Sequence, residues 1–84
     1  MSTAFQVFMK KTTAELKGDN AYARALDKWR LLKCSFQKDA EAALRAKYPS
    51  AKARVINREC KIKWFAYCQA LINKRPYVDP GEFM

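Results

Sequence analysis

The sequence predicts an all-α domain of three to four helices, and three observations carry this prediction. Large apolar residues recur every three to four positions, Gly18 and Pro49 interrupt these runs, and no stretch alternates apolar and polar residues as a strand would. A length of 84 residues suits one domain. We therefore expect a single helical domain over residues 1–75, followed by an extended C-terminal arm over residues 76–84, where Pro and Gly are frequent.

The first helix is predicted over residues 3–17. Ser2 or Thr3 can cap its start through a side-chain oxygen. Gly18 follows the last periodic residue, at the position where a left-handed C-terminal cap is easiest to adopt.

Two further helices are predicted over residues 20–34 and 36–48, and the pattern also allows them to form one continuous helix. Asp19 or Asn20 is the expected cap of the first. Pro49 ends the second, because proline disfavours helix at the residue before it.

The last helix is predicted over residues 50–75, with Ser50 as its cap and Pro76 after its end. It holds seven Lys or Arg residues and one acid, Glu59, so it carries +6 of the net charge of +9. The predicted core consists of the inner faces of all the helices: Phe5, Phe8, Leu16, Tyr22, Leu26, Trp29, Leu32, Phe36, Leu44, Ile56, Trp64 and Leu71.

The excess of positive charge indicates a polyanionic partner. The chain has 17 Lys and Arg residues against 8 Asp and Glu residues, which is typical of proteins that neutralise phosphates. Trp29 and Trp64 are expected in the core, so Tyr77 and Phe83 of the arm are the better candidates for an aromatic contact with a partner. The predicted nucleic-acid-binding residues are Lys10, Lys11, Arg24, Lys28, Lys52, Arg54, Arg58, Lys61 and Lys63.

The residue types argue against an enzyme. The chain lacks histidine, the commonest general base and zinc ligand, and its three cysteines form no C-x-x-C pair. Its two glycines cannot build a loop around a phosphate. We expect no catalytic site, no cofactor and no metal.

The number of cysteines and the distribution of apolar residues indicate the cellular compartment in which the protein resides. Cys34, Cys60 and Cys68 are an odd set, and neither a signal peptide nor a transmembrane segment is evident. This favours buried, reduced thiols in an intracellular, reducing compartment, with a bond from Cys34 to either of the other two as the alternative.

The first half resembles an HMG box. Residues 4–8 (AFQVF) open a helix after small hydroxylated residues, Lys28-Trp29-Arg30 stands where that family has an aromatic core residue in its second helix, and residues 38–48 are similar to the start of its third helix. The resemblance implies an L-shaped helical fold that binds and bends DNA through the minor groove.

Two functions follow as hypotheses. The first is a nucleic-acid-binding module (for DNA or RNA) that contacts the phosphate backbone with little sequence specificity. The second is a structural accessory subunit of a large ribonucleoprotein or organellar assembly. Its protein partners would bind the arm at residues 76–84 and a second apolar face of the last helix, formed by Ile62, Phe65 and Ile72. A membrane-surface helix is a weaker third hypothesis, because the apolar residues already account for a folded core.

Overall fold

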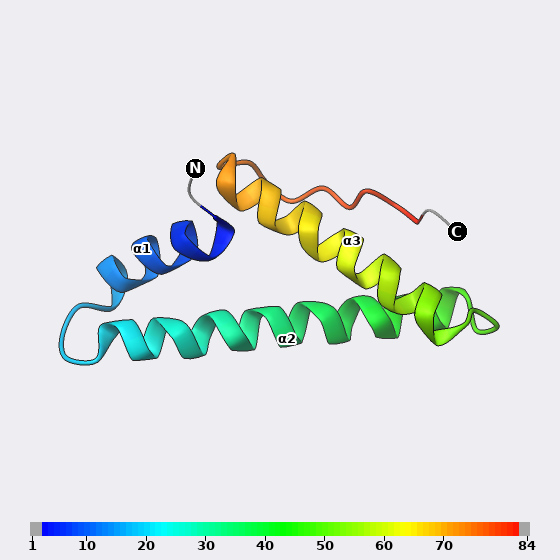
Figure 1. Ribbon diagram of the computed structural model, residues 1–84, viewed down its shortest axis with the longest axis horizontal. Helices are drawn as coiled ribbons and strands as arrows, with labels where there is room; N and C mark the ends of the chain where they lie inside the picture. The colour runs from blue at the N-terminus through cyan, green and yellow to red at the C-terminus, as the bar shows by residue number, and fades with distance from the viewer. Residues whose placement is uncertain (1–2, 83–84) are drawn as a thin grey trace.

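The computed structural model describes residues 3–82, and within them it is all-helical, with three helices and no strand. The helices are α1 (Ala4–Leu16), α2 (Ala21–Lys47) and α3 (Ala53–Ile72). Each of the three contacts the other two. Figure 1 shows α2 along the long axis, with α1 and α3 leaning on the same side of it and the chain after α3 running back beside that helix.

The first helix begins at a capping box. The Thr3 hydroxyl accepts a hydrogen bond from the Gln6 backbone N–H at 3.2 Å, and the Gln6 side-chain oxygen accepts one from the Thr3 N–H at 3.0 Å. This confirms Thr3 as the cap, while Ser2 lies outside the described residues. After Leu16 the chain turns through Gly18, whose φ of +111° is a conformation that residues with a Cβ rarely adopt.

The second helix is one element of 27 residues, with no break near Ser35. At 1.5 Å per residue it is about 40 Å long. Asn20 occupies the N-cap position as predicted, but its φ of 63° is left-handed and its side chain makes no capping hydrogen bond. Of residues 38–48, which resemble the start of a separate helix in the HMG box, residues 38–47 continue α2 without interruption and Tyr48 is its C-cap.

The third helix is shorter at both ends than predicted. Lys52 is its N-cap, so the prediction of Ser50 as the cap is wrong. A turn closed by a 3.1 Å hydrogen bond from the Ala51 N–H to the Tyr48 carbonyl occupies that position instead. The helix ends at Ile72 because Lys74 adopts a left-handed φ of 54° soon after it.

The core has two parts. One is a small apolar cluster of Leu44, Ile56 and Cys60 near the turn between α2 and α3. The other is an aromatic cluster in which neighbouring ring centroids lie 5.2–5.8 Å apart. Its rings, which belong to all three helices and to the segment after them, are Phe5, Phe8, Trp29, Phe36, Trp64, Tyr67 and Tyr77.

The predicted core residues are buried or half-buried in the structure, with the exception of Tyr22. Leu44 and Ile56 are fully buried, and the other predicted residues are half-buried, except for Tyr22, which is 60% exposed. Tyr22 lies in the first turn of α2, next to the connection from α1, and α3 lies against the opposite half of α2 (Figure 1).

Candidate nucleic-acid interface

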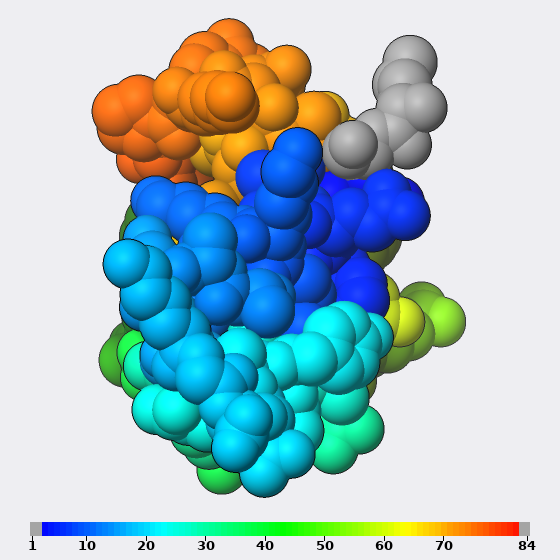
Figure 2. All heavy atoms as spheres, turned by 90° about the vertical axis from the view of Figure 1, so that its left-hand side faces the viewer, coloured from blue at the N-terminus to red at the C-terminus, as the bar shows by residue number. Residues whose placement is uncertain are grey.

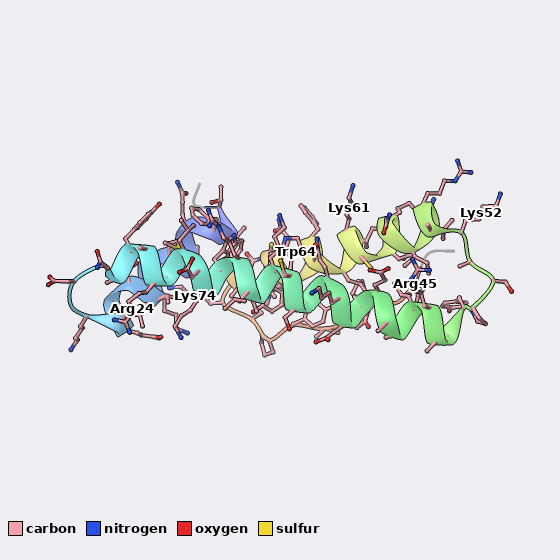
Figure 3. All side chains as sticks on the ribbon, turned by 90° about the horizontal axis from the view of Figure 1, so that it is seen from below. Arg24, Arg45, Lys52, Lys61, Trp64 and Lys74 are labelled. Atoms are coloured by element: carbon pink, nitrogen blue, oxygen red, sulfur yellow. The ribbon has the colours of Figure 1, made fainter. Side chains whose placement is uncertain are left out.

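Eight of the nine predicted phosphate-binding residues form two groups along a molecule 48 Å long. Figure 3 shows Arg24 near one end of the long axis and Lys52 near the other. Figure 2 shows the first of these ends, which α1 and the start of α2 cover. The α1–α2 basic group is exposed and consists of Lys10, Lys11, Arg24 and Lys28. The second group, also exposed, consists of Lys52, Arg54, Arg58 and Lys61.

Three cations of the second group lie on one face of α3. Arg54, Arg58 and Lys61 are spaced by four and three residues, which superimposes them along a helix. We call them the α3 basic face. The buried residues Ile56 and Cys60 lie on the opposite side of the helix, where they meet α2. Lys52 precedes the helix and points to the same side of the molecule as Lys61 in Figure 3.

The α3 basic face carries no exposed acid. The only carboxylate in α3 belongs to Glu59, which is fully buried, and the Arg58 guanidinium lies 3.8 Å from it. The Arg58 side chain is nevertheless 58% exposed. Within the described residues no ion pair involves Arg54 or Lys61. The face therefore presents positive charge that no neighbouring surface carboxylate of α3 neutralises.

The α1–α2 basic group has a different charge pattern. The exposed acids Glu15, Asp19 and Asp27 stand in the same segments as its cations. Mixed charges weaken the attraction for a polyanion, because each carboxylate repels the phosphates that a nearby cation attracts. The α3 basic face is therefore the stronger candidate.

Lys63, the ninth predicted phosphate-binding residue, is buried and does not belong to an exposed basic surface, so that prediction is wrong for it. Its side chain is 6% exposed and its ammonium donates a 2.6 Å hydrogen bond to the Asp79 carboxylate. A second carboxylate, that of Glu82, lies 3.8 Å away. The returning C-terminal segment covers this lysine, so its charge is neutralised inside the molecule.

The Lys63–Asp79 pair shifts the pKa of both groups. The hydrogen bond from Lys63, with another from the Gly81 N–H at 2.9 Å, lowers the pKa of Asp79. Burial alone would lower the pKa of Lys63, but the hydrogen bond to Asp79 and the charges of Asp79 and Glu82 outweigh it and raise the pKa. Both groups are therefore charged at neutral pH.

The segment after α3 is held against its own chain. The Tyr77 ring lies 5.6 Å from the Phe36 ring and 5.8 Å from the Tyr67 ring, between centroids, and is half-buried. Lys47 pairs with Glu82 at 3.3 Å. The expectation that Tyr77 is free for a partner is therefore wrong, and Phe83 lies outside the described residues.

Sequence reasoning overlooked one exposed residue beside the α3 basic face. Phe65 is 64% exposed and follows Lys61 by four residues, so it extends the same face by one turn. It was grouped with Ile62 and Ile72 as a second apolar face, but both of those are half-buried. The spacing of four, three and four from Arg54 to Phe65 is the signal that identifies it.

The remaining chemistry of the described residues is sparse. All three cysteines are free thiols: Cys60 is buried, Cys68 is half-buried, and Cys34 is exposed, contrary to the expectation that all three are buried. Burial raises the pKa of the Cys60 and Cys68 thiols. Among residues 3–82, no group of His, Cys, Asp or Glu side chains could hold a metal ion.

No helix within residues 3–82 combines the length and apolar character that crossing a bilayer requires.

Comparisons with protein-family models, with curated proteins and with solved structures give no match.

Proposed function

We propose that this protein is a non-enzymatic nucleic-acid-binding module that contacts the phosphate backbone with little sequence specificity. The observation that carries the proposal is the α3 basic face, where Arg54, Arg58 and Lys61 are exposed together and the only acid of the helix is buried. Flexible cations along one surface neutralise phosphates and release counterions, and such contacts position a nucleic acid without reading its bases.

Three further features support the proposal. The net charge of +9 favours association with any polyanion. Because α3 lies outside the segment that resembles the HMG box, its basic face supports nucleic-acid binding independently of that resemblance. The three free thiols support a reducing, intracellular setting.

Binding of labelled DNA and RNA to two triple variants tests the proposal. R54Q/R58Q/K61Q removes the α3 basic face, whereas K10Q/K11Q/K28Q removes the same charge from the α1–α2 basic group. We expect the first variant to bind markedly more weakly and the second to bind almost as the wild type does. Equal losses would mean that net charge alone governs binding and would overturn the assignment to α3.

An accessory subunit is the second candidate, and the exposed apolar side chains favour it. Leu31 of α2 is 70% exposed and Val78 is 78% exposed, so both remain available to another protein. A chain that aggregates when purified alone, and that binds no nucleic acid, would favour this alternative.

A further inference from the structure

The face that carries the phosphate-binding cations also presents a large aromatic ring to solvent. Phe65 exposes 64% of its surface, whereas the buried residues of α3 lie on the other side of the helix. It stands four residues after Lys61 and eleven after Arg54, which places it about 6 Å and about 16 Å from them along the helix axis. Tyr22 is the other markedly exposed ring of the described chain, and it lies among the mixed charges at the start of α2.

An exposed ring beside a row of cations is the arrangement that single-stranded nucleic acids require. Bases of a single strand have free faces that stack on aromatic side chains, while the adjoining phosphates are bound by Lys and Arg. A duplex satisfies the cations equally well but keeps its base faces stacked on one another. The ring therefore adds a contact for single strands that a duplex lacks.

We propose that α3 binds single-stranded nucleic acid, with phosphates on Arg54, Arg58 and Lys61 and a base stacked on Phe65. This inference rests on the proposed function and names the substrate class of the same site. Charge complementarity selects this occupant over an apolar protein segment, because three cations without an exposed acid flank the ring on its N-terminal side. Every base has a stacking face, so single-stranded DNA and RNA are both ligands.

Four variants test the stacking contact, each measured by fluorescence anisotropy with oligothymidylate, oligouridylate and a DNA duplex. F65A removes the ring, F65L keeps an apolar side chain without an aromatic face, F65W keeps the aromatic face, and Y22A removes a similarly exposed ring from the first turn of α2. Because Phe65 is a surface residue, unchanged melting temperatures verify that each variant is folded.

We expect F65A and F65L to bind single strands about 5- to 150-fold more weakly, which is the loss expected for one stacked base. F65W and Y22A should bind single strands as the wild type does, and duplex affinity should remain unchanged throughout. F65A should also keep the salt dependence of the wild type, since stacking releases no counterions.

Two results would overturn the inference, and they differ from failure of the proposed function. Wild-type single-strand affinity in F65A and F65L, together with a loss in R54Q/R58Q/K61Q, would leave the phosphate contacts standing and reject stacking. An equal loss in F65A for single strands and duplex would likewise reject it. Unchanged binding by R54Q/R58Q/K61Q would reject the proposed function itself.

Discussion

Lys63 shows why residue type and helical spacing do not decide which cations are functional. From the sequence it is one of several Lys and Arg residues in a basic helix, but its position faces α2 and the returning C-terminal segment. Its carboxylate partner Asp79 lies 16 residues further along the chain, so only the tertiary structure brings the two together. Arg54 lies two to three helical turns before Lys63, and Lys61 lies about half a turn before it. Both remain exposed.

Replacing Asp79 by Asn should destabilise the protein by about 1 kcal/mol. The change leaves the buried ammonium of Lys63 without its nearest counter-charge, but Asp79 is itself 59% exposed and Glu82 remains nearby, so the cost stays well below that of a fully buried pair. Urea unfolding followed by circular dichroism measures the difference. Asp27→Asn, which alters an exposed acid at the far end of α2, is the matched control and should leave stability unchanged.

The difference in stability between wild type and D79N should depend on pH in a defined direction. The pKa of Asp79 is lower in the folded state than its ordinary value of 3.8, so its contribution is present above that value and is lost as the pH falls through the folded pKa. The pKa of Lys63 is raised above 10.5, so its contribution is complete below that value and is lost only as the pH rises through the folded pKa. The difference between wild type and D79N should shrink as the pH falls below 3.8 and vanish once the pH is below the folded pKa of Asp79. A difference that stays constant as the pH falls from 3.8 to the acid-unfolding limit would contradict the account.

At the scale of the elements, the sequence predicts what is encoded locally. Thr3 caps α1 because its partner Gln6 stands three residues away, and Pro49 limits α2 through its own ring. The continuity of α2 through Ser35 was open, because a serine inside a helix is compatible with either outcome. The start of α3 was misplaced because the turn over residues 48–51 competes with a cap at Ser50, and no local pattern reveals which is preferred.

Thr3, which caps α1, and Ser50, which does not cap α3, give a paired prediction. Thr3→Ala should destabilise α1 and the domain by about 1 kcal/mol, since it leaves a backbone N–H of the first turn without its acceptor. Ser50→Ala should change stability by less than about 0.5 kcal/mol, because Ser50 lies outside α3. Thermal unfolding of both variants checks the pair, and a larger loss in S50A than in T3A would show that the helix starts are assigned incorrectly.

At the scale of the whole molecule, the chain is less compact than its length would allow. Its radius of gyration is 14.8 Å, against about 12 Å for a compact domain of this length. Its accessible surface is 6276 Å², against about 5,100 Å² for a compact monomer of 9.7 kDa. Few residues are fully buried, and the aromatic cluster supplies much of the cohesion between α1, α2, α3 and the segment after them.

Trp64 joins the two halves of that cluster, since its ring contacts that of Trp29 on one side and those of Phe36 and Tyr67 on the other. Trp64→Ala should cost about 3 kcal/mol, the lower end of the range for a large aromatic residue, because the side chain is only half-buried. A domain of this size has a stability of about 5 kcal/mol, so the variant should be partly unfolded at moderate temperature. Urea unfolding measures the loss, with Leu31→Ala as an exposed apolar control. A Trp64→Ala protein as stable as that control would contradict the assignment of the core.

The α3 basic face is the central functional claim, and the salt dependence of binding tests it most directly. Each phosphate contact contributes about −0.9 to the slope of log K against log salt concentration on duplex DNA, and about −0.7 on single strands. If Arg54, Arg58 and Lys61 each bind a phosphate, R54Q/R58Q/K61Q should flatten the slope by about two to three units while the circular dichroism spectrum stays unchanged. A folded triple variant with the affinity and salt slope of the wild type would contradict the claim that this face binds nucleic acid.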